Sequence, residues 1–166
     1  MLHPNLLLIP VLVAPATPTP DPIHLKGGLY VLRGVPDAAT LQELRVHRFT
    51  HVLDLRQDGE DERQMAQESA ALAELGIQYL RYAIPVAPPA ADFDFLRQIL
   101  RTLPQGARVL VHCGDGNRAS AAVCVHLILD LGMKSEKATA LAHDGGLSHP
   151  ETLKALAAYL AAHARG

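Results

Sequence analysis

A cysteine, two glycines and an arginine lie close together in the segment VLVHCGDGNRAS, which runs from Val109 to Ser120. The apolar run before Cys113 predicts a buried strand, and the residues after the glycines predict a helix. A thiol beside backbone N–H groups and a helix N-terminus has its thiolate stabilised by partial positive charge. The same N–H groups can bind an oxyanion, and the planar guanidinium of Arg118 matches two of its oxygens. The segment therefore predicts a thiolate-dependent enzyme that acts on a tetrahedral oxyanion such as phosphate or sulfate.

The rest of the chain alternates predicted strands and helices that can position this segment. Apolar runs predict strands at Gly28–Leu32, Thr50–Leu55, Ile77–Ile84 and Ala107–His112. Helical patterns are expected at Ala38–His47, Asp61–Leu75, from Asp92 or Asp94 to Leu103, from the loop to Leu131, at Ser135–His143, and after Ser148. Such alternation predicts a three-layer α/β/α fold with a mostly parallel sheet of four or five strands. Cys113 then falls at the carboxyl end of a strand, where ligands bind in sheets of this kind.

Several of these helices carry a predicted N-terminal cap. Asp37 and Ser135 precede or open helical segments, and short polar side chains favour that position. Ser148 and Glu151 have the spacing of a capping box for the final helix.

Composition limits the number of domains and the classes of partner. A chain of 166 residues suits one domain with its own core. Fifteen Lys and Arg against seventeen Asp and Glu leave a formal charge of −2, so no nucleic-acid or anionic-membrane partner is expected. Cys113 and Cys124 lie eleven positions apart and imply no disulfide framework, which favours a reducing, cytoplasmic environment.

The N-terminal stretch is expected to lie outside the catalytic domain. Residues 6–16 are apolar but too few to span a bilayer, and no cation precedes them as in most secretory signals. We interpret residues 1–24 as an arm, or an edge strand, followed by an extended proline-rich connector, with a cleaved signal as the alternative. Residues 25–166 are predicted to form a single domain.

The cysteine segment resembles the signature His-Cys-x-x-Gly-x-x-Arg-Ser/Thr of the cysteine-dependent protein tyrosine and dual-specificity phosphatases. His112, Cys113 and Gly116 stand where that signature has them. The stretches at 28–36, 52–56 and 76–79 follow the order seen in small bacterial phosphatase-like domains, including the one described as beta-lactamase-hydrolase-like. The resemblance covers residues 25 to about 147 and implies the phosphatase-like version of the three-layer fold.

The loop departs from the usual phosphatase signature in length. Four residues, rather than five, separate Cys113 from Arg118, and Ala119 replaces the hydroxyl residue that normally follows the arginine. A loop of this length is typical of rhodanese-like sulfurtransferases, which carry a persulfide on the cysteine. The bacterial phosphatase-like group also shows it, with Gly-Asn-Arg or Gly-Thr-Arg. The order of the whole chain favours phosphatase chemistry, and the loop length leaves sulfur transfer open.

These residues predict a phosphomonoester hydrolase that forms a phosphocysteine on Cys113. The phosphate would be bound by the loop and the start of the helix, namely Gly114, Asp115, Gly116, Asn117, Arg118 and Ala119. His112 is expected to bond the backbone and tune the thiol. Arg56 is expected to give structural support through a carboxylate. Ser120 could donate to the cysteine sulfur and assist its release, or could be an ordinary helical residue.

No general acid is evident from the sequence. Residues 84–88 lie where the phosphatases carry that aspartate, and they contain none. Asp92 is the nearest carboxylate downstream, and its alternative role is a helix cap. Asp115 could act as acid or position water, although its side chain is expected to point away from an anion. Asp58 follows another strand and could equally be part of a solvated turn.

Three functions therefore remain: a phosphatase, a sulfurtransferase, and an inactive module that binds a phosphorylated partner. The expected substrate is a phosphoprotein, a phosphoinositide or a small phosphorylated metabolite. The scattered histidines show no paired ligand spacing, so neither a metal nor another cofactor is predicted. The oligomeric state cannot be predicted.

Overall fold

Short strands with apolar faces form a mixed, mostly parallel sheet. In the computed structural model, which describes residues 21–163, the strands are β1 (Ile23–Lys26), β2 (Leu29–Val31), β3 (His51–Asp54), β4 (Gln78–Arg81) and β5 (Val109–His112). Their spatial order is β1-β2-β5-β3-β4. Strand β1 is antiparallel to β2, and all other neighbours are parallel. The predicted sheet is confirmed.

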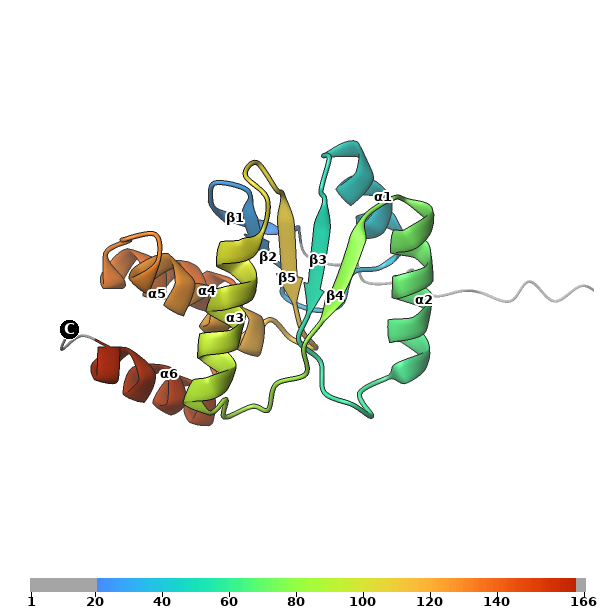
Figure 1. Ribbon diagram of the computed structural model, residues 1–166. Coiled ribbons are helices and arrows are strands. Elements are labelled where there is room, and N and C mark those ends of the chain that lie inside the picture. Colours follow the sequence, from blue (N-terminus) through green and yellow to red (C-terminus); the bar gives the residue numbers. More distant parts are fainter. Residues whose placement is uncertain (1–20, 164–166) are drawn as a thin grey trace, which may run out of the picture.

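Helices cover both faces of the sheet (Figure 1). One face carries α1 (Ala38–Val46) and α2 (Glu62–Glu74), and the other carries α3 (Ala90–Thr102), α4 (Asn117–Leu129), α5 (Ser135–Asp144) and α6 (Pro150–His163). Helix α4 contacts α3, α5, α6, β2 and β5, so it is the central helix of its layer. The arrangement confirms the predicted three-layer α/β/α fold.

The central strands are buried on both faces because successive side chains point to opposite sides. Val52 and Leu110 pack with Leu72 of α2 in one apolar cluster. Their neighbours Leu53 and Val111 belong to the other cluster, under the helices α3 to α6. Apolar clusters therefore pack on both faces of β3 and β5. This packing also holds in place the residues at the carboxyl ends of the two strands.

Strand β1 was not predicted from the sequence. It spans only four residues whose burial alternates between half-buried and exposed, and it joins β2 through a tight turn at Gly27 with φ of +59°. So short an amphipathic run carries little periodic signal. The arm and most of the proline-rich connector proposed for residues 1–24 lie outside the described residues.

Three predicted helix starts differ from the structure. Helix α3 begins at Ala90 after Pro89 without a side-chain cap, so neither Asp92 nor Asp94 opens it. Helix α5 begins at Ser135 but has Lys134 at the N-cap position. The Ser148 hydroxyl donates to the Gly146 carbonyl instead of forming the predicted capping box.

The predicted cap at Asp37 is confirmed, since its carboxylate accepts the N–H of Thr40. Asp61 also caps its helix, because its carboxylate accepts the N–H of Gln64. Within residues 21–163 no helix combines the length and apolarity needed to cross a bilayer.

Candidate active site

Cys113 follows β5 directly and stands at the carboxyl edge of the sheet, between the ends of β2 and β3. Residues 114–116 form a loop, and α4 begins at Asn117 with Gly116 as its N-cap. Gly116 has φ of +88°, and a Cβ atom there would collide with the carbonyl oxygen of Gly145. Glycine is therefore required at this position, by backbone conformation and by the close approach of a second loop.

Arg118 in the first turn of α4 is 6% exposed, and two loops hold its guanidinium. Its Nη1 and Nη2 atoms donate to the Glu60 carboxylate at 2.6 and 2.7 Å, and Nη1 also donates to the Ile84 carbonyl at 3.1 Å. Burial opposes the charge, but Glu60 and a thiolate at Cys113 favour it, and together they raise the pKa of Arg118. The guanidinium therefore stays charged beside the sulfur.

Glu60, from the loop between β3 and α2, is the carboxylate that orients this arginine. Its hydrogen bonds to Arg118 lower its pKa, so it is ionised at neutral pH. A Cβ atom on Gly114 would lie 3.4 Å from Glu60 Oε2, which places the carboxylate against the cysteine loop. The bidentate geometry fixes the plane of the guanidinium as well as its position.

Asp115 turns toward the thiol, contrary to the expectation that it points away. The Cys113 thiol donates to Asp115 Oδ1 at 3.5 Å, and the Asn117 N–H donates to the same oxygen at 3.0 Å. The other carboxylate oxygen, Oδ2, lies 3.1 Å from Nε2 of His149. The short polar side chain at a helix N-terminus binds the first free N–H, and this bond draws it over the sulfur.

The Cys113 side chain is fully buried, yet its sulfur does not face only apolar atoms. It contacts the Asp115 carboxylate and interacts with the Arg118 guanidinium, both of which are polar. The Asp115 side chain that contacts the sulfur is itself about half exposed to solvent. Cys124, by contrast, lies within α4, where burial raises the pKa of its thiol to about 11. Both cysteines are free thiols, as predicted.

A buried amide ties the cysteine loop to the loop before α6. Asn117 Oδ1 accepts from the N–H groups of Ser148 and His149, both at 3.0 Å. Asn117 Nδ2 donates to the Thr152 hydroxyl, which in turn donates to the Val86 carbonyl. Four segments therefore meet around Cys113 through one hydrogen-bonded network.

A second buried network surrounds His112, the residue that directly precedes Cys113. His112 shares a hydrogen bond of 2.8 Å with Glu68, and the Arg56 guanidinium binds Glu68 at 2.5 Å and Asp54 at 2.7 Å. The Tyr79 hydroxyl also donates to Asp54, at 2.6 Å. Burial opposes ionisation of Asp54, but the bonds from Arg56 prevail and lower its pKa. Glu68 on α2 thus joins His112 on β5 to Arg56, which follows the end of β3.

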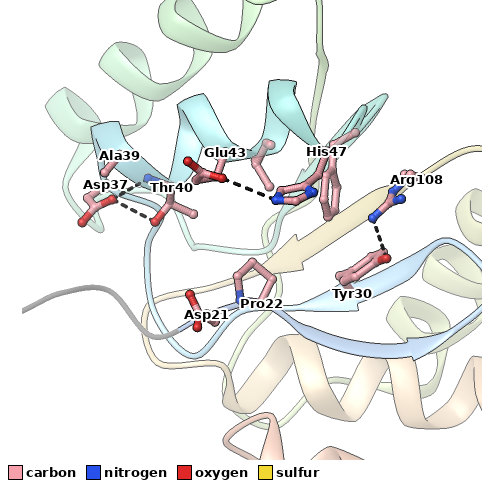
Figure 2. A pocket seen from close by; sticks show the side chains of 11 residues that line it. Asp21, Pro22, Tyr30, Asp37, Ala39, Thr40, Glu43, His47 and Arg108 are labelled. Carbon is pink, nitrogen blue, oxygen red and sulfur yellow. Dashed lines mark hydrogen bonds and ion pairs between the residues drawn. The ribbon is translucent and has the colours of Figure 1, made fainter.

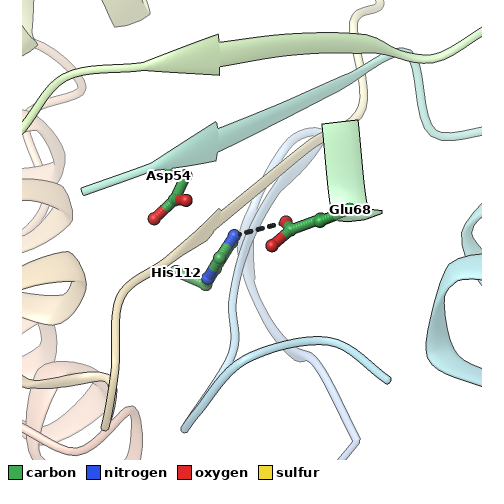
Figure 3. A group of neighbouring side chains, drawn as sticks. All are labelled: Asp54, Glu68 and His112. Atoms are coloured by element: carbon green, nitrogen blue, oxygen red, sulfur yellow. Dashed lines mark hydrogen bonds and ion pairs between the residues drawn. The ribbon is translucent and has the colours of Figure 1, made fainter. Parts of the chain in front are cut away.

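This network also holds the residue types of a metal site. Figure 3 shows Asp54, Glu68 and His112, whose ligand atoms lie within 4.8 Å of one another. The Arg56 guanidinium bonds both carboxylates and already supplies the positive charge that a metal ion would bring. The group therefore reads as a buried ion cluster rather than a metal centre.

Within residues 21–163, neither of two predicted catalytic residues forms a hydrogen bond with the Cys113 sulfur. Asp92 accepts from the Tyr82 hydroxyl at 2.9 Å in the first turn of α3. The Ser120 hydroxyl is buried without a hydrogen-bond partner, beside Gly145 and Val31 rather than bonded to Cys113. Three other residues were predicted to bind phosphate. Gly114 lies in the loop after β5, and Asn117 and Ala119 lie in the first turn of α4.

A cavity of about 520 Å³ lies along α1, from Asp37 at the start of that helix to His47 after its end (Figure 2). It is lined by Tyr30, Phe49 and Arg108, near the points where β3 and β5 begin. Arg108 donates to the Tyr30 hydroxyl at 2.6 Å and packs over both aromatic rings. None of its lining residues belongs to the cysteine loop at 113–118, so the cavity is separate from that loop.

Sequence reasoning missed two residues of the site, Glu60 and His149. Glu60 stands in a Gln-Asp-Gly-Glu run that is typical of a solvated turn, and His149 is one of nine histidines without paired spacing. Each reaches the site through a loop from a distant part of the chain. The only available sequence signal was that Glu60 follows a buried strand that ends at the same edge of the sheet as β5.

Neither a family model nor a curated protein sequence matches this chain. Its structure is similar to that of Tk-PTP in the active form, with a TM-score of 0.68 and 22% identity over 84% of this chain and 96% of that one. It is similar to PTPMT1 in complex with PI(5)P, with a TM-score of 0.63 and 17% identity over 84% and 95% of the two chains. TpbA from P. aeruginosa gives a TM-score of 0.61 and 20% identity, over 82% of this chain and 81% of that one. The resemblance predicted from the sequence is confirmed for the fold: the chain has the phosphatase-like α/β fold of the cysteine-dependent tyrosine and dual-specificity phosphatases.

Proposed function

We propose that this protein is a cysteine-dependent phosphomonoester hydrolase, with Cys113 as nucleophile and Arg118 as the main phosphate-binding side chain. The observation that carries the proposal is the charged Arg118 guanidinium held against the Cys113 sulfur by Glu60 and the Ile84 carbonyl. A thiolate nucleophile and a planar cation at the start of a helix suit a phosphoryl group with three equatorial oxygens.

The reaction would proceed in two displacements. The Cys113 thiolate attacks phosphorus, the S–P bond forms, and the P–O bond to the leaving group breaks while the leaving oxygen takes a proton. Water then attacks the phosphocysteine, the S–P bond breaks, and inorganic phosphate and the thiolate are released. Arg118 and the N–H groups of the loop stabilise the charge on the equatorial oxygens, and one such donor contributes about 3 kcal/mol in the transition state.

The substrate class follows from the same chemistry, a phosphate monoester that carries two negative charges. PTPMT1, one of the similar structures, holds PI(5)P, so a phosphoinositide headgroup belongs in the substrate panel together with phosphopeptides and small phosphate esters.

Hydrolysis of p-nitrophenyl phosphate by the purified protein tests the proposal. We expect phosphate release that is lost in Cys113→Ser and lowered about 10²-fold or more in Arg118→Lys, which keeps the charge but loses the planar fork. Cys124→Ala serves as the matched control, since that thiol is buried within α4 and should leave the rate unchanged. Activity that survives Cys113→Ser would contradict the proposal.

Sulfur transfer is the second candidate, and the four-residue spacing between Cys113 and Arg118 favours it. In that reaction the thiolate would take a sulfur atom from a donor as a persulfide and pass it to an acceptor such as cyanide. Incubation with thiosulfate and cyanide separates the two functions, because thiocyanate forms only in the second. Phosphate binding without either product would indicate an inactive binding module.

A further inference from the structure

The loop after β4 contains no aspartate, and the other candidate carboxylates are bonded to groups other than the Cys113 sulfur. Asp92 accepts from Tyr82, and Asp58 is paired with Arg81 at 2.6 Å. Glu60 is held by Arg118, which lowers its pKa and makes it a poor proton donor. Asp115 is the carboxylate that touches the reacting sulfur.

On the basis of the proposed function, we propose that Asp115 is the general acid of the reaction and that His149 is the residue that positions it. The Asp115 carboxylate uses its two oxygens separately. Oδ1 accepts a hydrogen bond from the Cys113 thiol at 3.5 Å, and Oδ2 lies 3.1 Å from His149 Nε2. The carboxylate therefore contacts the sulfur while about half of its surface stays exposed to solvent.

The proton that Asp115 needs is the one that the nucleophile must lose. Cys113 Sγ lies 3.5 Å from Asp115 Oδ1, and proton transfer along this hydrogen bond gives a thiolate and a neutral carboxylic acid. The thiolate attacks phosphorus, and the acid delivers the same proton to the leaving-group oxygen as the P–O bond breaks. In the second step the carboxylate takes a proton from the attacking water, the S–P bond breaks to release hydrogen phosphate and the thiolate, and Asp115 returns the proton to the Cys113 sulfur. No outside acid or base is consumed.

His149 is fixed in place by the backbone of its own loop. Its N–H donates to Asn117 Oδ1 at 3.0 Å, and the neighbouring Ser148 N–H donates to the same oxygen. A Cβ atom on Gly146 would lie 2.7 Å from the Asp115 carbonyl oxygen, so the two loops pack backbone against backbone. The backbone of the loop that carries the imidazole is held by these two bonds to Asn117, and the loop could move away from Asp115 only if they broke.

A substrate pair with different leaving groups tests the role of Asp115. p-Nitrophenolate leaves without protonation, whereas phenolate and alkoxide leaving groups need a proton. In Asp115→Asn we expect kcat/KM for phenyl phosphate to fall about 10²-fold relative to kcat/KM for p-nitrophenyl phosphate. The exposed Asp144→Asn, at the end of α5, is the control and should leave that ratio unchanged.

An unchanged ratio in Asp115→Asn, with p-nitrophenyl phosphate still hydrolysed, would overturn the role of Asp115 and leave the proposed function intact. If the wild-type protein hydrolysed neither phenyl phosphate nor p-nitrophenyl phosphate, the proposed function would be overturned, and this inference with it. Thermal unfolding of Asp115→Asn, whose side chain is half exposed, shows that the variant is folded when its rates are compared.

Two variants test His149 as a positioning residue. His149→Phe removes the ring nitrogen that lies 3.1 Å from the Asp115 carboxylate, and we expect the same ratio to fall about tenfold. His149→Gln can still donate a hydrogen bond to Asp115, so its ratio of kcat/KM values should stay close to that of the wild type. Equal ratios in the two variants would contradict a positioning role, because a purely structural defect does not distinguish between leaving groups.

Discussion

Two acidic side chains lie on the groups that would bind phosphate. Glu60 holds both terminal nitrogens of Arg118, and Asp115 accepts the N–H of Asn117 and the thiol of Cys113. A phosphate that enters the loop must share or displace these carboxylates. Their contacts keep the donors oriented, but their charge opposes the incoming anion.

Glu60→Gln separates these two effects. We expect kcat/KM for p-nitrophenyl phosphate to fall about 10²-fold, because a loosened guanidinium no longer sits in reacting geometry. Steady-state kinetics give the value, and Glu62→Gln in the first turn of α2 is the control. An increase in kcat/KM would show instead that the carboxylate acts mainly as a competitor for the arginine.

At the residue scale, the sequence identified Cys113 and Arg118 because their spacing is local. It could not identify Glu60 or His149, which are separated from the cysteine by long stretches of chain and become neighbours only when loops converge. The orientation of Asp115 was predicted wrongly because electrostatic repulsion was considered without the free N–H at the start of α4.

The elements β3, β5 and α2 are joined by a buried ion cluster of Asp54, Arg56, Glu68 and His112. Replacing one member leaves an uncompensated buried charge, which costs far more than an exposed ion pair gains. Since His112 precedes the nucleophile directly, this cluster also fixes the end of β5.

Glu68→Ala is therefore expected to lower the free energy of unfolding by about 3–5 kcal/mol, because Arg56 loses a buried partner. Urea denaturation measures the change. Glu74→Ala, exposed near the end of the same helix, should shift the free energy by only about 0.5 kcal/mol. Similar losses in the two variants would contradict the role assigned to the cluster.

The cluster also predicts a pH dependence of stability. Burial opposes the ionisation of Asp54, but the bonds from Arg56 lower its pKa below the ordinary value, so its contribution to stability is complete above about pH 5 and is lost as pH falls through the folded-state pKa. Urea denaturation at several acidic pH values should show a shallower fall in stability for Asp54→Asn than for wild type. Parallel curves would contradict this prediction.

At the element scale, strands and helices with clear periodicity were predicted correctly, and their boundaries were less reliable. The start of α3 was placed too late because Asp92 looks like a cap, whereas its carboxylate bonds Tyr82 on the segment after β4. Strand β1 was missed because its pairing with β2 depends on a turn rather than on its own composition.

For the whole molecule, the alternation of strands and helices was enough to predict three layers and the edge at which the site would form. The sequence could not show how closely the loops would pack there. Gly116, Gly145 and Gly146 let two loops touch backbone to backbone, and only the folded chain shows which glycines meet.

Binding of inorganic phosphate should stabilise the whole domain. At a phosphate concentration of 100 times Kd, the free energy of unfolding should rise by about 2.7 kcal/mol. Thermal unfolding with increasing phosphate measures this in the wild type, and Arg118→Ala should lose most of the effect. Equal stabilisation of both proteins would mean that phosphate binds elsewhere.

The most direct test of the account is to trap the covalent intermediate. Wild-type protein mixed with p-nitrophenyl phosphate is quenched rapidly in acid, digested and analysed by mass spectrometry. The account predicts one added phosphoryl group on the peptide that contains Cys113, and none on that peptide in Cys113→Ser. Turnover without phosphoryl on this cysteine, or a phosphoryl group on another residue, would contradict it.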